Sequence, residues 1–421
     1  MKPRTYLIVV LGLAAMLSGA VIGLNARIDP YGLAAGPDIG NVVADTPRPG
    51  AFWRKALTVR EARPRTIVLG TSRADFGIIP RSSAFASEYA PVLNLSLGGL
   101  SIDQIRLMLI HANTVSPLRL AVIGLDLESF LDVGRSDFDP AALEGNPESE
   151  PQSLVRFRLG VSREALSASL AQLTGSDAAA GVRAPKAQTN DPRAWRIPDS
   201  ALKLWDGQHG LIWVAEFDNF YARVPLLFPQ ASTASRWNSD LRRAAAMASF
   251  RELLRYARSH DIEVRMFISP VHARYFEWYR HVGWWPLFEA WKRALVDATE
   301  TVDAKATGAV AQPAIVLWDF GSFHSIATET VPPIGDHASH MRWYRDTSHY
   351  SPDVGDLVLA RILGGPGQET SPLPDSRLTK ASIDDAISRI RLEALRYRLA
   401  VPGESADIGD MLAYLRRVAK K

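Results

Sequence analysis

The distribution of apolar residues divides the chain into parts of different character. Residues 5–25 form one uncharged, mostly apolar run. After it, short apolar runs of strand length alternate with longer stretches in which apolar residues recur at helical spacing. The alternation stops between about 134 and 235 and then resumes. The pattern therefore predicts an N-terminal apolar helix followed by an α/β domain that carries an insertion.

Five short runs have the form of buried parallel strands, which are continuously apolar and contain β-branched residues. They cover residues 66–69, 92–95, 120–125, 262–268 and 314–318. Helical spacing occurs at residues 102–112, 241–258, 273–298 and 352–363. We expect Ser101 and Ser351 to be N-caps, and a break in the third helical stretch near Gly283 and Pro286. This order predicts a flavodoxin-like, three-layer α/β domain with a central parallel five-stranded sheet.

The remaining segments lie outside this alternation. Residues 29–62 contain several Pro and Gly and are interpreted as a tether between the apolar run, 1–28, and the α/β domain, 63–366. The insertion at about 134–235 is expected to be partly loop, with one helical piece near 163–173. Residues 367–421 are interpreted as a helical tail with two amphipathic helices, at about 383–399 and 408–419.

The N-terminal run indicates the compartment. About 20 helical residues at ~1.5 Å each match a hydrocarbon core of ~30 Å. Lys2 and Arg4 precede the run, which favours a cytoplasmic N-terminus and an exported remainder. The sequence thus predicts a single-pass protein of the inner (cytoplasmic) membrane with its domain on the periplasmic side. A signal peptide cleaved near Ser18-Gly19-Ala20, with secretion of the rest, is the alternative.

Composition narrows the function classes. The formal net charge of +3 provides no electrostatic argument for a nucleic-acid partner. The chain has no cysteine, which removes disulfides, thiolate metal sites and cysteine nucleophiles. His337 and His340 resemble a spaced metal pair, but no third ligand has suitable spacing. We therefore expect neither a metal nor a cofactor.

Candidate chemistry gathers where predicted strands end, which is where sites form in open parallel sheets. Ser72 follows the first strand at the start of a helix, where N–H groups and the helix dipole favour a developing negative charge. Gly98 and Gly99 follow the second strand and can offer backbone N–H groups. Taken singly, the segment of Ser72 also fits an ordinary helix cap, and the segment of Gly98 and Gly99 also fits a tight turn between strand and helix.

A third segment, just before the last core helix, contains Asp346 and His349. An acid three residues before a histidine on a turn can fix the tautomer of the imidazole and direct it towards a serine. A serine hydroxyl is a poor nucleophile and needs such a base within roughly 2.6–3.2 Å. An ordinary loop histidine with an acid nearby is the alternative interpretation of this segment.

The order and strand context of the three segments resemble the SGNH/GDSL hydrolase superfamily. That family has a nucleophilic Ser after its first strand, a Gly donor after the second, an Asn donor after the third and Asp-x-x-His near its end. Here Ser72 stands in Gly70-Thr71-Ser72-Arg73, and Asn94 to Gly99 has the Asn-x-x-x-x-Gly form of the second block. The likeness covers roughly residues 64–133 and 238–363, and it looks nearest to the bacterial polysaccharide O-acetylation type, such as the alginate O-acetylation proteins.

The resemblance implies a catalytic triad of Ser72, Asp346 and His349, with Gly99, or alternatively Gly98, as oxyanion donor. The third block departs from the family, because Asp126 and Glu128 stand where the Asn donor is expected. An ionised carboxylate cannot donate a hydrogen bond, and a missing donor costs ~10²–10³ in rate.

Four residues near the predicted site are candidates for substrate binding. They are Arg73, Asp126, His272 and Asp319. Each has a structural alternative. Asp126 is expected to form an ion pair with Arg73 or Arg345, and His272 fits a capping or packing role equally well.

The resemblance implies a serine esterase or O-acetyltransferase that acts on acyl esters, in particular of an exported carbohydrate. The two activities differ in the acceptor of the acyl group, which is water for an esterase and a sugar hydroxyl for an O-acetyltransferase. The alternative is a non-catalytic binding or assembly module of a cell-envelope polysaccharide or secretion complex. The missing Asn favours this module, and the intact Ser, Asp and His oppose it.

Overall fold

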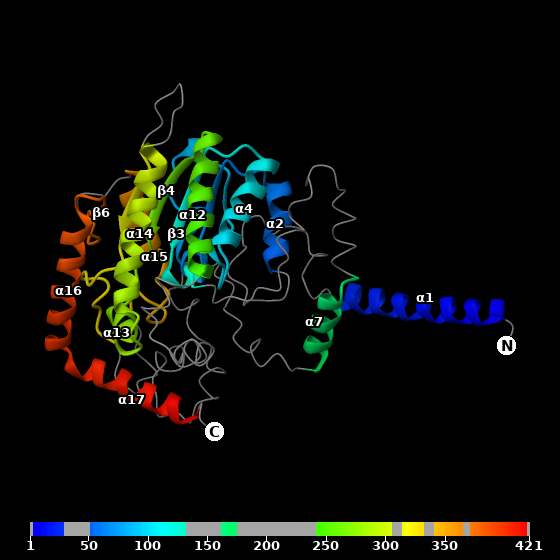
Figure 1. Cartoon of the computed structure of the whole chain (residues 1–421). Helices are drawn as coiled ribbons and strands as arrows, with labels where there is room; N and C mark the ends of the chain where they lie inside the picture. The colour runs from blue at the N-terminus through cyan, green and yellow to red at the C-terminus, as the bar shows by residue number, and fades with distance from the viewer. Residues whose placement is uncertain are drawn as a thin grey trace.

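A mixed, mostly parallel sheet of six strands forms the centre of the protein (Figure 1). The computed structural model describes residues 3–28, 51–131, 161–174, 241–304, 314–331, 341–364 and 371–418. The strands are β1 (Thr66–Leu69), β2 (Val92–Asn94), β3 (Leu120–Leu125), β4 (Glu263–Ile268), β5 (Val316–Asp319) and β6 (Arg377–Leu378). Their order is β2-β1-β3-β4-β5-β6; the first five are parallel, and β6 is antiparallel to β5.

The prediction of an α/β domain is confirmed, and all five predicted strands form. The sheet has six strands instead of the five expected, because β6 adds an antiparallel edge from the segment interpreted as a tail. Two residues, one of them Arg377, form that strand. So short a strand produces no periodic hydrophobic pattern, which explains why the sequence did not predict it.

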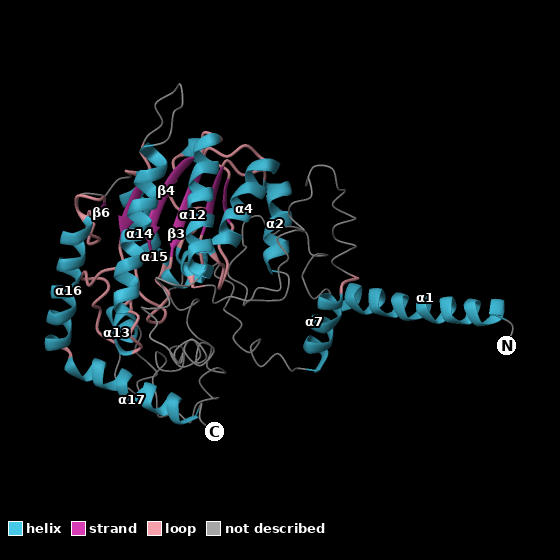
Figure 2. Ribbon diagram, in the orientation of Figure 1, coloured by secondary structure: helices cyan, strands magenta, loops and turns pink. Residues whose placement is uncertain are grey.

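Helices cover both faces of the sheet (Figures 1 and 2). One hydrophobic cluster joins one face to α2 (Ala51–Ala62), α4 (Ile102–Val115), α12 (Leu241–Ser259) and α14 (Trp285–Ala304). The other face packs on α3 (Ser72–Gly77) and α15 (Pro352–Leu363). Along β1, Ile67 and Leu69 belong to the first cluster and Val68 to the second. Burial on both faces is the reason that this strand is continuously apolar.

Helix α2 corrects the interpretation of residues 29–62 as a tether. It packs against α4, and Phe52, Ala56 and Val59 are buried. These residues are spaced i, i+4 and i+7, a helical pattern that the Pro- and Gly-rich residues before it obscured. Residues 29–50 lie outside the described part of the chain.

The expected helix boundaries are met at three points. Ser101 caps α4 in a capping box with Gln104. Ser351 is the N-cap residue of α15, although its hydroxyl makes no capping bond. The stretch 273–298 divides into α13 (Ala273–His281) and α14, and between them Gly283 has φ +77°, a left-handed conformation that favours glycine.

The apolar N-terminal run forms α1 (Pro3–Ile28), which is long and apolar enough to cross a membrane; a signal sequence would have the same character. In Figure 1, α1 projects away from the sheet, with α7 (Arg163–Thr174) beside its C-terminal end. The hydroxyl of Ser169 in α7 donates to Asn25 Oδ1 at 2.8 Å. Helix α7 is the predicted helical piece of the insertion. The rest of the segment 134–235 lies outside the described residues.

The two predicted C-terminal helices are α16 (Ile383–Ala400) and α17 (Pro402–Val418). Helix α17 begins six residues earlier than expected, with Pro402 as its first residue, where the missing N–H of proline is tolerated. Helix α16 packs against α14, and α17 packs against α13. The described part of the tail is therefore joined to the α/β domain by side-chain packing as well as by β6.

Helices α3 and α15 approach each other closely at Gly77 and Gly355. A Cβ on Gly355 would lie 1.7 Å from the carbonyl oxygen of Gly77, which is backbone and cannot move aside as a side chain does. We expect Gly355→Ala to lower the free energy of unfolding by about 1–3 kcal/mol or more, measured by urea titration of the purified chain.

Gly409→Ala in α17 is the matched control. A Cβ there would meet only the His281 ring, at an ordinary 3.4 Å, so we expect no loss of stability or a gain of up to ~1 kcal/mol. A Gly355→Ala chain as stable as the wild type would contradict the described packing.

Candidate active site

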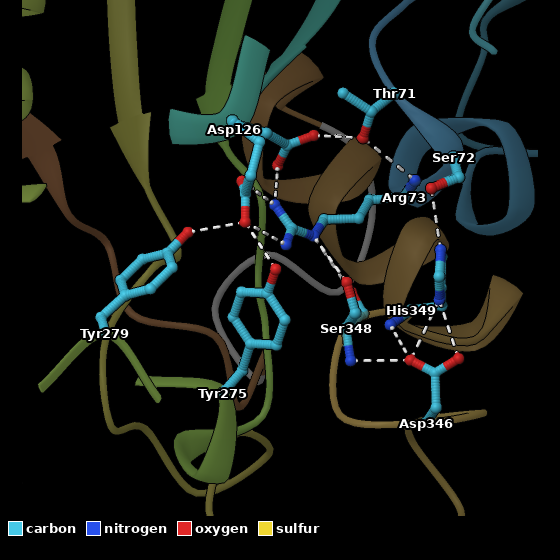
Figure 3. Close-up of polar contacts among 10 residues, drawn as sticks. Thr71, Ser72, Arg73, Asp126, Tyr275, Tyr279, Asp346, Ser348 and His349 are labelled. Carbon is cyan, nitrogen blue, oxygen red and sulfur yellow. Dashed lines mark hydrogen bonds and ion pairs between the residues drawn. The ribbon is translucent and has the colours of Figure 1, made fainter. Parts of the chain in front are cut away.

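Ser72, His349 and Asp346 form a continuous hydrogen-bonded chain (Figure 3). Ser72 is the first residue of α3, directly after β1, and the other two residues stand in the loop before α15. Ser72 Oγ lies 2.8 Å from His349 Nε2, and His349 Nδ1 lies 2.8 Å from Asp346 Oδ2. The structure thus brings together the three residues that the sequence predicted as a triad, although 277 positions separate the serine from the histidine.

The Asp346 carboxylate accepts hydrogen bonds from backbone N–H groups as well as from the His349 imidazole. Its Oδ1 accepts the backbone N–H groups of Ser348 at 2.8 Å and His349 at 2.9 Å. Burial raises the pKa of this carboxyl, but His349, the neighbouring Arg345 cation and the Ser348 N–H outweigh burial and lower it to about 2. The carboxylate is therefore ionised at neutral pH and holds His349 Nδ1 as the protonated nitrogen, which leaves Nε2 to accept from Ser72.

Short-range structure places the serine at the start of its helix. The side chain of Thr71 caps α3 by accepting the Arg73 N–H at 3.3 Å. Gly70 permits the sharp turn out of β1, because a Cβ there would lie 2.8 Å from the Ala74 Cβ. Asn94, at the end of β2, donates to the carbonyl oxygens of Ala74 and Ile78 at 3.0 and 2.8 Å and so binds the end of the same helix.

One of the two candidate oxyanion glycines lies beside the serine. A Cβ on Gly98 would be 3.7 Å from Ser72 Cβ, so this residue faces Ser72. Gly99 has φ +75°, a backbone conformation that glycine adopts without strain. Within the described part of the chain, neither glycine N–H donates to another residue. Of the two, Gly98 is the one that the structure brings next to Ser72.

The residues that replace the expected Asn donor bind Arg73 instead. Glu128 accepts from Arg73 Nη1 and Nη2 at 3.0 and 3.1 Å, and Asp126 Oδ1 lies 2.8 Å from Nη1. Burial lowers the pKa of the Arg73 guanidinium, but the two carboxylates more than compensate, and the pKa lies above its usual range. The expected ion pair of Asp126 is formed with Arg73.

Two tyrosines of α13 complete this buried cluster (Figure 3). The hydroxyl groups of Tyr275 and Tyr279 donate to Glu128 Oε1 at 2.5 and 2.9 Å. Burial and the Glu128 carboxylate raise the pKa of Tyr279 well above its usual value. The Tyr279 phenol therefore keeps its proton at neutral pH and continues to donate.

The assignment of Arg73 and Asp126 as substrate-binding residues is not supported, because each is buried and faces the other. A substrate would have to displace a charged partner to reach either of them, at a high desolvation cost.

His272 and Asp319 also have structural partners in place of a substrate. His272 Nδ1 accepts the N–H of Arg274 as the N-cap of α13, and Nε2 lies 2.7 Å from the Glu329 carbonyl oxygen. Burial lowers the pKa of His272 to about 4, so the ring is neutral. Asp319 forms a buried ion pair with Lys292, at 2.8 and 2.9 Å. Neither side chain is available to bind a substrate.

A second buried cation, Lys55, lies beside the site and was not predicted from the sequence. Lys55 of α2 donates to Asp75 Oδ1 of α3 at 2.5 Å and to the carbonyl oxygen of Ser96. Ser96 immediately precedes the loop of Gly98 and Gly99. Lys55 therefore joins α3 to the candidate oxyanion loop. Its place inside an apolar helical pattern was the available signal, because a lysine on a buried face needs an acidic partner.

The candidate metal pair, His337 and His340, lies outside the described residues. In the ranges that the structure does describe, no group of three His, Asp or Glu side chains has the arrangement of a metal site.

Comparison with known proteins adds no family assignment: no protein-family model matches the chain, and no curated protein matches it either.

The depressed pKa of Asp346 predicts a pH-dependent contribution to stability. The ordinary value is 3.8 and the value in the folded protein is about 2, so the contribution is complete above pH ~4 and is lost as the pH falls towards 2. We expect the stability difference between wild type and Asp346→Asn to shrink by about 2 kcal/mol between pH 5 and pH 2, measured by urea titration at each pH.

Asp384→Asn provides the control, because this carboxylate pairs with Arg293 at the surface with its side chain 79% exposed. We expect the difference between this variant and wild type to stay nearly constant over the same pH range. A constant difference for Asp346→Asn as well would show that the carboxylate is not held as described.

The Lys55–Asp75 pair predicts coupling between α2 and α3. Removing the ammonium alone by Lys55→Met leaves a buried carboxylate without its cation, and we expect a loss of about 3–5 kcal/mol. The double variant Lys55→Met/Asp75→Asn should recover a large part of that loss in urea titrations. Strictly additive effects of the two changes would contradict the direct pairing.

Proposed function

We propose that this protein is an SGNH-type serine acyl-transfer enzyme, an esterase or O-acetyltransferase. The observation that carries the proposal is the 2.8 Å contact between Ser72 Oγ and His349 Nε2, with Asp346 at 2.8 Å on the far side of the ring. This arrangement supplies a nucleophile, a general base and an orienting carboxylate. The strand order of the five parallel strands supports the finer fold assignment, a flavodoxin-like three-layer domain, to which β6 is an addition.

The proposed reaction begins when Ser72 Oγ attacks the carbonyl carbon of an acyl ester. A carbon–oxygen bond forms while His349 Nε2 takes the hydroxyl proton, and the carbonyl electron pair moves onto the oxygen. When the tetrahedral intermediate collapses, the ester carbon–oxygen bond breaks and His349 returns its proton to the departing alcohol. An acyl group remains on Ser72. Asp346 stays ionised throughout and stabilises the imidazolium.

The acceptor in the second half of the reaction decides between the two activities. His349 removes a proton from water in an esterase, or from a sugar hydroxyl in an O-acetyltransferase, and the new oxygen attacks the acyl carbon. The bond between the acyl carbon and Ser72 Oγ then breaks, and His349 returns its proton to Ser72 Oγ. Gly99 and Gly98 are the proposed donors to the oxyanion. Asp126 and Glu128 stand where the family has its Asn donor, and both pair with Arg73. Because this third donor to the oxyanion is missing, we expect a rate of acyl transfer that is lower by ~10²–10³.

The setting proposed for this chemistry is the periplasmic side of the inner membrane. Helix α1 has the length and hydropathy of a single-pass anchor. Lys2 precedes it and Arg4 lies in its first turn, which favours a cytoplasmic N-terminus. Secretion after cleavage of the same segment is the alternative. Both settings suit an exported carbohydrate as the carrier of the ester.

A non-catalytic binding or assembly module of a cell-envelope polysaccharide or secretion complex is the second candidate. The carboxylates at the third donor position favour it, since they leave the oxyanion side of the site with fewer donors than the family has.

The test is hydrolysis of p-nitrophenyl acetate by the purified full chain. We expect Ser72→Ala to reduce turnover by at least about 10³-fold, because the nucleophile is lost. A fluorophosphonate probe should label the wild type and leave Ser72→Ala unlabelled.

Ser82→Ala is a matched control ten residues further along the chain, where the hydroxyl contacts Asp356 at the surface. Turnover that survives Ser72→Ala would refute the triad. Failure of the wild type both to label and to hydrolyse the ester would favour the binding module.

A further inference from the structure

One buried guanidinium joins four segments at the site. Arg73, 4% exposed, lies in α3, which follows β1. Asp126 and Glu128 follow β3, Tyr275 and Tyr279 belong to α13, which follows β4, and Ser348 stands in the loop before α15. Figure 3 shows the carboxylates and Ser348 around the guanidinium, and the hydroxyls of Tyr275 and Tyr279 directed at the Glu128 carboxylate.

Every nitrogen of the Arg73 guanidinium has an acceptor. The two Nη atoms face Glu128 and Asp126, as described above. The Nε atom donates to Ser348, with the carbonyl oxygen at 3.2 Å and Oγ at 3.1 Å. The guanidinium also lies over the Tyr275 ring, 4.8 Å from its centroid. A planar, fully paired guanidinium of this kind defines the direction of each bond and resists rotation.

The contact with Ser348 links Arg73 to the general base. Ser348 immediately precedes His349, and its N–H donates to Asp346 Oδ1. Two groups thus hold the turn from Asp346 to His349: the Asp346 carboxylate, which accepts its N–H groups, and the Arg73 guanidinium, which donates to Ser348. Arg73 is also the residue that follows Ser72 in the chain. Arg73 therefore links the chain segment of Ser72 to that of His349: its backbone adjoins Ser72, and its Nε donates to Ser348, which adjoins His349.

We propose that Arg73 is the positioning residue of this site: its guanidinium, held by Asp126 and Glu128, sets the distance between Ser72 and His349 through Ser348. This inference rests on the acyl-transfer function proposed above. It also assigns a role to the two acids of the third block, which hold the guanidinium in the orientation that reaches Ser348.

Arg73→Lys in the full chain tests the proposal. Lysine keeps the positive charge that the buried carboxylates require, but its single ammonium cannot pair with Glu128 in a fork and also reach Ser348. We expect kcat for p-nitrophenyl acetate to fall on the order of 10²-fold, with KM within about twofold of wild type, because misplacement of the base by ~1 Å affects the chemical step.

Arg361→Lys is the matched control. Arg361 is another buried arginine, in α15, whose Nη2 donates to the Leu373 carbonyl oxygen at 2.7 Å, and it lies outside the triad and the Arg73 cluster. We expect this variant to lose stability and to keep the kcat of the wild type. If both arginine variants lose kcat in proportion to their loss of stability, Arg73 has only a structural role and the proposal fails.

A spectroscopic measurement separates positioning from activity. The ¹⁵N resonance of an unprotonated imidazole nitrogen shifts when it accepts a hydrogen bond, and His349→Gln identifies the His349 signal among the nine histidines. We expect Arg73→Lys to move the Nε2 resonance to its position in Ser72→Ala. A resonance that stays at the wild-type position would overturn the proposal.

This readout also distinguishes the two hypotheses. A wild type without acyl-transfer activity would refute the proposed function, and the Nε2 resonance would still report whether Arg73 sets the contact between Ser72 and His349.

If Arg73→Lys does not fold, Ser348→Ala removes one of the Arg73 contacts and leaves the charges in place. We expect it to shift the Nε2 resonance in the same direction and to lower kcat by about 10-fold or less. Where both single variants fold, their effects on kcat should not multiply in the double variant, because they break one path. Effects on kcat that multiply in the double variant would contradict the proposal that Arg73 acts through Ser348. A Ser348→Ala chain indistinguishable from wild type would contradict it as well.

Discussion

Burial of the Arg73 guanidinium is the interaction on which the arrangement of the site depends. A buried cation is tolerated only where its donors are paired, and here Glu128, Asp126 and Ser348 supply the acceptors. The two carboxylates follow β3, and Ser348 stands in the loop before α15, so the partners come from two different connections at the carboxyl edge of the sheet. The requirement to pair one side chain therefore draws together segments that are up to 275 residues apart in the chain.

Helix α3, which begins with Ser72, depends on such contacts because it is short. Six residues cannot form a stable helix alone, so α3 is held by its surroundings. Lys55 binds it through Asp75, Asn94 binds its last carbonyl groups, and Gly355 allows α15 to approach it. Contacts from α2, β2 and α15 therefore set the position of the Ser72 hydroxyl.

Many features of this fold could be predicted from local sequence. The continuous apolar runs indicated all five parallel strands, and the caps at Ser101 and Ser351 indicated helix starts. The triad was also accessible, because Ser72, Asp346 and His349 each stand at a turn next to a recognisable element. Helix α2 and β6 were missed: α2 follows a Pro- and Gly-rich segment, and β6 is too short to show a period.

The roles of the other charged residues could not be predicted in this way. Arg73, His272 and Asp319 looked available for a substrate, since the sequence places each next to a strand end. The structure pairs each with a partner far along the chain, such as Lys292 for Asp319. A carboxylate, imidazole or guanidinium has the same local signature whether it faces a ligand or a buried partner. Only the tertiary arrangement distinguishes the two.

The sequence by itself therefore determined the five parallel strands, most of the helices and the edge of the sheet at which the candidate site residues gather, because hydrophobic periodicity and turn residues act over a few positions. The tertiary structure decided which polar groups face the solvent-accessible serine and which neutralise one another inside. That decision follows from long-range packing, since an ion pair such as Arg73 with Glu128 forms only after the connections that follow β1 and β3 have met.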